Sequence, residues 1–218
     1  MLSKGFIYKS IDYKESSKIV YLYTKEGKIS FKALGVNKKN NPFSSVLLTS
    51  NIIEYEITAS NFPSLINASI SYSFMNDIEN LKIVEALRII IELLNIMPED
   101  INHEANYMFL EKTLFDLKIN SDKALAIFLI KMLYNFGITP NFKECLKCGK
   151  KDSLVEISPY LGGALCDICG NNHNYDIWNE YYHKKSDINN YKDTDFHKLL
   201  NEINEFYKIH LNYDLKIK

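Results

Sequence analysis

The first third of the chain alternates between apolar and polar residues with the period of two that is typical of β-strands. Together with many β-branched and aromatic residues, this alternation predicts strands at residues 5–10, 17–24, 28–35, 46–49, 52–59 and 68–74. Gly27 follows two polar residues and is typical of a hairpin connection. Five or six short strands without a long helix favour a small closed β-barrel of the OB type, with an SH3-like barrel as the nearest competitor.

After these strands the period changes to 3.6, which is typical of amphipathic helices. Apolar positions predict one helix that begins near Leu81 and a second at about residues 99–117. Ser121 is the expected N-cap of a third helix, which is apolar on nearly all sides and should therefore lie at the centre of a bundle. Thr194 is the expected N-cap of a final helix, whereas residues 171–193 show only weak patterning.

All the cysteines of the chain lie between the third and the final predicted helix. They form two C-x-x-C pairs separated by seventeen residues: Cys145 with Cys148, and Cys166 with Cys169. This is the spacing of a tetrahedral four-thiolate zinc site, and the glycine after each pair suits a tight turn that needs a positive φ. Short strands expected at 154–157 and 163–165 complete the pattern of a zinc ribbon. Because four protein ligands leave no open position, we predict one structural Zn²⁺; a disulfide, a redox pair and simple core cysteines are the alternatives.

Charge is distributed unevenly along the chain. The net charge is −1, but residues 1–41 hold nine lysines against three acidic residues. Such a basic segment predicts contact with an anionic partner such as nucleic acid, or else a solvated lysine-rich face. Since Arg88 is the only arginine, lysine must supply any phosphate contacts. The best candidates lie on or after the third strand and in the preceding loop and strand: Lys14, Lys18, Lys28, Lys32, Lys38 and Lys39.

Several function classes lack their sequence signatures. The chain has no G-x-x-x-x-G-K-[ST] phosphate loop, and the His-x-Glu element of zinc deaminases is missing as well. No apolar run approaches the length of a membrane span, and the N-terminus lacks the apolar core of a signal peptide. The sequence therefore predicts a cytoplasmic protein that is not an enzyme and has no membrane contact.

Several segments carry a family resemblance in the right order over nearly the whole length. They are Gly-Phe-Ile at 5–7, Asp-Tyr-Lys-Glu-Ser at 12–16, residues 23–29, Ala-Leu-Gly at 33–35, Phe-Gly-Ile-Thr-Pro at 136–140 before the first cysteine pair, and Tyr-Lys-Ile-His-Leu at 207–211. This pattern closely resembles the RecO family of bacterial DNA repair and recombination mediators. Where that family has an arginine-rich segment, this chain has Asn-Lys-Lys-Asn at 37–40, which keeps positive charge but loses bidentate arginine contacts.

The resemblance implies an α+β multi-domain fold. Its parts are an OB-fold barrel at 1–76, a helical domain at 77–143 plus 173–218, and a zinc-binding insertion at 144–172. It also implies a mediator of the RecFOR pathway that binds single- and double-stranded DNA, at the nucleoid, and anneals complementary strands. Such a mediator works with RecR and single-strand-binding protein to load RecA. The alternative is a protein-interaction scaffold with a structural zinc unit; a metal-dependent hydrolase is a distant third, because four thiolates close the coordination sphere.

Two further sets of residues follow from this reading. The family implies that the helical domain captures the acidic C-terminal tail of single-strand-binding protein, which requires an apolar pocket rimmed by cations. Arg88 and Lys131 lie on apolar helices and are the candidates, unless both merely extend from the bundle to water. The candidate base-stacking rings, which are otherwise barrel core, are Tyr8, Tyr21, Tyr23 and Phe31.

Overall fold

The computed structural model describes residues 3–217 and contains two compact units, Met1–Glu111 and Lys112–Lys218. Helix α2 (His103–Asp116) runs across the boundary between them. Among the described residues, no helix is both long and apolar enough to cross a bilayer.

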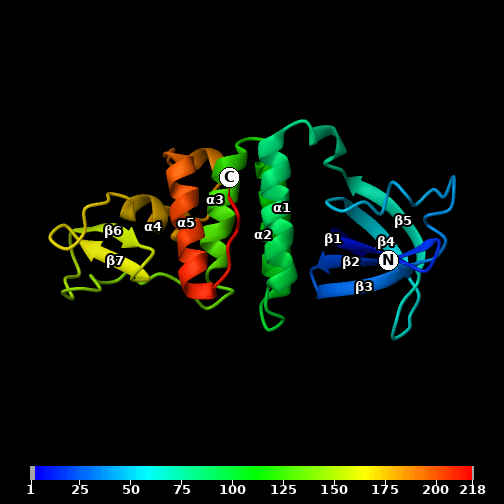
Figure 1. Cartoon of the computed structure of the whole chain (residues 1–218), viewed down its shortest axis with the longest axis horizontal. Coiled ribbons are helices and arrows are strands. Elements are labelled where there is room, and N and C mark those ends of the chain that lie inside the picture. The colour runs from blue at the N-terminus through cyan, green and yellow to red at the C-terminus, as the bar shows by residue number, and fades with distance from the viewer. Residues whose placement is uncertain (1–2, 218) are drawn as a thin grey trace. The chain divides into compact units, whose positions relative to one another are not determined.

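The first unit is built on a five-stranded antiparallel sheet with the order β3-β2-β1-β4-β5 (Figure 1). The strands are β1 (Ser3–Tyr13), β2 (Ser17–Thr24), β3 (Gly27–Ala33), β4 (Ile52–Ile57) and β5 (Leu65–Tyr72). The period of two turns one face of the sheet inward, where Ile7, Leu22 and Phe31 are fully buried in one core. The predicted α+β class and the strands at 17–24 and 28–35 are confirmed.

The two edge strands of this sheet, β3 and β5, approach each other at a single point. Lys32 forms one parallel bridge with Ser64, and its backbone N–H donates to the carbonyl of Pro63 at 2.8 Å. Before β5 the chain forms a turn. The backbone N–H of Thr58 donates to the carbonyl of Ser64, and the N–H of Ser64 donates to the hydroxyl of Thr58. Among residues 3–217 this bridge does not extend into a ladder that closes the sheet, so the predicted closed OB barrel is not confirmed.

The strand predicted at residues 46–49 is wrong, because this segment forms turns. The Leu47 N–H donates to the carbonyl of Phe43 at 3.0 Å, and the Asn51 side chain donates to the carbonyls of Ser45 and Val46. Leu47 is fully buried in the core of the sheet. The short apolar run therefore belongs to a turn that packs Leu47 into the core, and it is not a strand.

Two helices follow the sheet in sequence. A short 3₁₀ turn, η1 (Met75–Asp77), leads to α1 (Leu81–Ile96), whose N-cap Asn80 accepts hydrogen bonds from the first turn. On α2, the apolar positions Tyr107, Leu110 and Leu114 are buried. Both predicted helices are thus confirmed, although α2 begins four residues later than expected.

The second unit is organised around α3 (Ser121–Met132), which is buried on nearly every side, as predicted. It lies beside α5 (Phe196–Leu211), where the Tyr207 hydroxyl donates to the carbonyl of Leu129 at 2.9 Å (Figure 1). The remaining elements of this unit are β6 (Leu154–Ser158), β7 (Gly163–Cys166), α4 (Tyr175–His183) and the 3₁₀ turn η2 (Ile188–Asn190).

Three sequence-based expectations for this unit need correction. The N-caps are Asn120 for α3 and Asp195 for α5, each one residue away from the predicted Ser121 and Thr194. Both side chains accept a hydrogen bond from the backbone N–H three residues later, as N-cap residues do. Helix α4 lies in the weakly patterned segment, where it was not predicted, because it is only nine residues long.

Candidate metal centre and nucleic-acid interface

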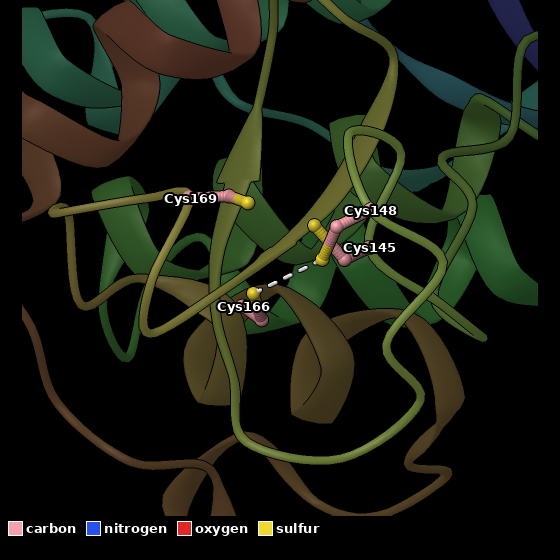
Figure 2. Close-up of side chains that lie close together, drawn as sticks. All are labelled: Cys145, Cys148, Cys166 and Cys169. Carbon is pink, nitrogen blue, oxygen red and sulfur yellow. Dashed lines mark hydrogen bonds between the residues drawn. The ribbon is translucent and has the colours of Figure 1, made fainter.

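The four cysteines converge on one point in the second unit. The sulfurs of Cys145, Cys148, Cys166 and Cys169 all lie within 4.8 Å of one another, and they turn toward a common centre in Figure 2. The Sγ atoms of Cys148 and Cys166 are 3.6 Å apart. Cys145 and Cys166 are buried, whereas Cys148 is exposed. Two loops therefore present one compact set of thiols.

Each C-x-x-C pair folds as a tight turn. The N–H of Gly149 donates to the carbonyl of Cys145 at 2.8 Å, and the N–H of Gly170 donates to Cys166 at the same distance. The glycines serve different needs. Gly149 has a φ of 75°, whereas a Cβ on Gly170 would lie only 2.8 Å from a carboxylate oxygen of Glu156. The expected positive φ is thus confirmed only at Gly149.

The geometry of this cluster suits a metal ion. Four sulfurs at tetrahedral corners, each 2.3 Å from zinc, would lie about 3.8 Å apart, which is close to the spacing found here. Burial raises the pKa of the Cys145 thiol, but hydrogen bonds from backbone amides, led by that of Cys166, outweigh burial and lower the pKa to about 6. The cluster can therefore hold a metal ion, and binding would release protons from the other thiols.

Polar side chains fasten the cysteine-bearing loops to the helices of the second unit. The carboxylate of Glu156 accepts the backbone N–H groups of Asn171 and Asn172, just after the second cysteine pair. Asn174 bonds both backbone groups of Ile157 on β6. Its amide also donates to Glu202 on α5 at 2.8 Å. The loops are thus continuous with the helical core.

In the first unit, four of the predicted phosphate-binding lysines lie on adjoining segments of the chain. The loop at 34–41 docks on the β1–β2 turn, because Asn37 donates to Asp12 and to the carbonyl of Ser16, both at 2.9 Å. The lysines of these two segments and of the adjoining start of β2 are Lys14, Lys18, Lys38 and Lys39. Among the residues that the structure describes, none of the four forms an ion pair. We call these four residues the lysine cluster.

Lys28 and Lys32 lie outside the lysine cluster. The Lys28 ammonium donates to the carbonyl of Met97 at 2.7 Å and lies 3.4 Å from the carboxylate of Glu99, so its charge is already engaged. Lys32 points to the outer face of β3, where its ammonium stands 4.5 Å from the ring centre of Phe62.

The four candidate base-stacking rings differ in how far they are exposed to solvent. Tyr8, Tyr23 and Phe31 are at most 6% exposed and belong to the packed interior, and burial raises the pKa of Tyr8 to about 12. Only Tyr21 is half-buried, on the outer face of β2. Two residues of this outer face were missed from the sequence, Lys9 and Phe62. Alternation from buried Ile7 would place Lys9 on the inner face, and only the register shift between these two residues turns it outward. Phe62 lies in a loop without a pattern.

Arg88 lies at an apolar pocket of about 450 Å³ in the first unit. Its lining includes Met75, Ile78, Val84 and Ile91, with Arg88 at one side. The guanidinium donates two bonds to Glu85, at 2.6 and 2.9 Å, and one to Glu92 at 2.7 Å. These hydrogen bonds raise the pKa of Arg88, so its charge is permanent but locally neutralised.

Lys131 belongs to the other unit and is engaged at the end of α4. Its ammonium donates to the carbonyls of Tyr182 at 3.0 Å and Lys184 at 2.7 Å. Burial, together with the charge of Lys185, lowers the pKa of Lys131 from 10.5 to about 8. The side chain thus joins α3 to the C-terminal end of α4.

This pKa shift predicts a pH-dependent stability. Between pH 8 and 10.5 the unfolded chain keeps a proton that folded Lys131 has lost. Raising the pH through this window therefore favours the folded state, by up to ~3 kcal/mol relative to Lys131→Met. Urea unfolding at pH 7, 9 and 10.5 measures the difference between the two proteins. The difference in stability between the wild type and the exposed control Lys151→Met should not change with pH, because both proteins keep Lys131. A change as large as that found between the wild type and Lys131→Met would contradict the assignment.

Comparison with known proteins connects both units to one family. The family "Recombination protein O N terminal" matches residues 1–74, and "Recombination protein O C terminal" matches residues 78–178. The chain is 28% identical over 174 residues to "DNA repair protein RecO" of Enterococcus faecalis. This match covers 76% of this chain and 65% of that protein. The protein of the same name from Caldicellulosiruptor saccharolyticus is 29% identical over 182 residues, covering 80% of this chain and 74% of the relative. In the first of these comparisons, the match spans less than two thirds of the relative.

Proposed function

The chain belongs to the RecO family, and from this premise we propose that it acts in DNA repair and recombination as a mediator that binds DNA. It would bind single and double strands through the five-stranded unit, anneal complementary strands and help to load RecA together with RecR and single-strand-binding protein. This role consists of binding and strand pairing and requires no catalytic centre.

The lysine cluster is the observation that carries the proposal. The four lysines form no ion pair with any described residue, and they lie on the segments that join where the loop at 34–41 docks on the β1–β2 turn. The Lys14 ammonium lies 5.3 Å from the ring centre of Tyr13. Phosphate backbones bind such cation groups with little dependence on base sequence. We further propose that the unit, at about residues 1–76, is an incompletely closed OB fold; the strand order and the Lys32–Ser64 bridge support this. In OB folds, nucleic acid lies along the face of strands 2 and 3 and the adjacent loops.

We propose that the cysteine cluster holds one Zn²⁺ with a structural role. Soft thiolates favour zinc, and four of them leave no position for a substrate. The bonds from Glu156 and Asn174 to the loops support a role in holding residues 144–172 against the helical domain, which we place at 77–143 plus 173–218.

Strand annealing tests the mediator role directly. Two complementary oligonucleotides that carry a fluorescence donor and acceptor are first coated with single-strand-binding protein. We expect the protein to accelerate the appearance of energy transfer several-fold and to shift each labelled strand in a gel. An unchanged annealing rate, with no gel shift, would favour the scaffold alternative.

We propose that the apolar pocket beside Arg88 receives the acidic tail of single-strand-binding protein. The tail's apolar end would occupy the pocket, and its carboxylates would replace Glu92 as the partner of Arg88. Lys131 is the weaker candidate, because two carbonyls already bind its ammonium.

Matched variants on α1 test this pocket. Val84→Glu places a carboxylate in the lining and should weaken binding of the tail peptide by ~tenfold or more, whereas Leu81→Glu, outside the lining, should not. Glu92→Gln should strengthen binding, because it frees one bond of Arg88. Calorimetry with the isolated tail peptide measures each affinity. Equal affinities for Val84→Glu and Leu81→Glu would place the tail elsewhere.

A further inference from the structure

The outer face of β1, β2 and β3 carries aromatic rings and lysines in a regular arrangement. In the strand register, Lys9 pairs with Tyr21, Ile11 pairs with Ile19, and Ile19 pairs with Lys32. A register shift between Ile7 and Lys9 turns Lys9 outward directly after buried Tyr8. We call Lys9, Ile11, Ile19, Tyr21, Lys32 and Phe62 the ring face.

Each ring of this face has a lysine above it. The Lys9 ammonium lies 5.3 Å from the ring centre of Tyr21, and the Lys32 ammonium lies 4.5 Å from that of Phe62. Phe62 is 41% exposed and does not belong to the core of the sheet. The bridge from Lys32 to Ser64 fixes the loop that presents Phe62 over β3. The ring face therefore holds one ring on a strand and one on a loop that is joined to β3, and none of its six residues is a carboxylate.

We propose that the ring face binds unpaired bases, with Tyr21 and Phe62 each stacking one base of a single strand. The inference rests on the proposed DNA-binding function and assigns its base contacts. A flat ring accepts any base, because every base has a π-face, and an adjacent ammonium serves the phosphate that follows it. Lys9 and Lys32 would leave the rings and contact phosphates as the bases take their places. Because stacking a base is worth more than an exposed cation–π contact, the exchange favours the bound state.

This arrangement makes the two parts of the binding surface chemically distinct. The lysine cluster meets phosphates, which duplex and single strands both offer. The ring face requires bases that are free of their partners, which only single strands offer. The ring face is thus a determinant of strand preference.

Binding of the full chain to three probes tests the inference. The probes are oligothymidylate, an abasic sugar-phosphate strand of equal length, and a duplex. We expect Tyr21→Ala and Phe62→Ala each to weaken oligothymidylate binding about tenfold. Both should leave abasic and duplex binding unchanged, and Tyr21→Phe should retain affinity. Tyr160→Ala removes a ring that is 78% exposed in the other unit and serves as the matched control.

A second measurement keeps the test independent of folding. In Tyr21→Trp, a stacked base should quench the new indole on oligothymidylate and should not do so on the abasic strand. The natural Trp178 is fully buried and gives a constant background. If wild-type protein binds oligothymidylate and both alanine variants bind it equally well, the ring face is overturned while the proposed function stands. Equal losses on oligothymidylate and on the abasic strand would likewise overturn stacking. A wild-type protein that binds none of the probes would overturn the proposed function itself.

Discussion

Replacing Cys148 with serine should unfold residues 144–170 locally and leave the five-stranded unit intact. A structural zinc ion commonly contributes on the order of 10 kcal/mol to a unit too small to fold alone. Cys148 is exposed, so serine at this position loses little packing, whereas a change at fully buried Cys166 would also disturb the core. The variant therefore isolates the contribution of the proposed zinc ion.

Two readouts check this result. Metal analysis should find one zinc ion per chain in the wild type and little in Cys148→Ser. Amide hydrogen exchange should become fast at β6 and β7 and remain slow at Leu22 and Phe31, which lie in the core of the sheet. Wild-type protein that contains no zinc after careful purification, or unchanged protection in the variant, would contradict the structural-zinc proposal.

Reversing the charge of Lys38 and Lys39 together should weaken DNA binding about 100-fold at moderate salt. Each lost phosphate contact removes the release of nearly one counterion, and the two new carboxylates add repulsion. The loss should be similar for every base sequence, because phosphate contacts carry no sequence information.

A matched double variant separates local contact from overall charge. Lys25→Glu with Lys151→Glu produces the same change in net charge at two exposed lysines away from the lysine cluster. Its affinity for DNA should fall only slightly. Equal losses in the two double variants would show that overall charge, and no particular surface, governs binding.

Local patterns predicted most of the elements, and they failed where tertiary contacts decide the structure. β2 has the predicted bounds 17–24, because alternation and the hairpin glycine agree there. Residues 46–49 are as apolar as a strand, yet the Asn51 side chain takes the carbonyls that a neighbouring strand would bind. Helix α4 is anchored by Trp178, whose indole donates to Glu202 on α5, a contact that no local pattern contains.

The same distinction applies to the candidate sites. The spacing of the cysteines predicted that they cluster, because each C-x-x-C turn presents two thiols and a short hairpin between them can bring the turns together. Lysines were harder to assign. Lys28 was predicted to contact phosphate and Lys131 to bind a partner, but both ammonium groups bind carbonyls that only the fold brings within reach. Phe62 lies on the ring face because the bridge between Lys32 and Ser64 joins its loop to β3, and no local pattern predicts that contact.

The salt dependence of binding tests the central claim, which is that this protein binds DNA phosphates through lysines of the five-stranded unit. Anisotropy with a labelled single strand gives the binding constant K at several salt concentrations. With four to six lysines on phosphates, a plot of log K against log salt should have a slope of about −3 to −4. A flat plot, or no binding at low salt, would contradict the account and favour a scaffold that has no direct contact with DNA.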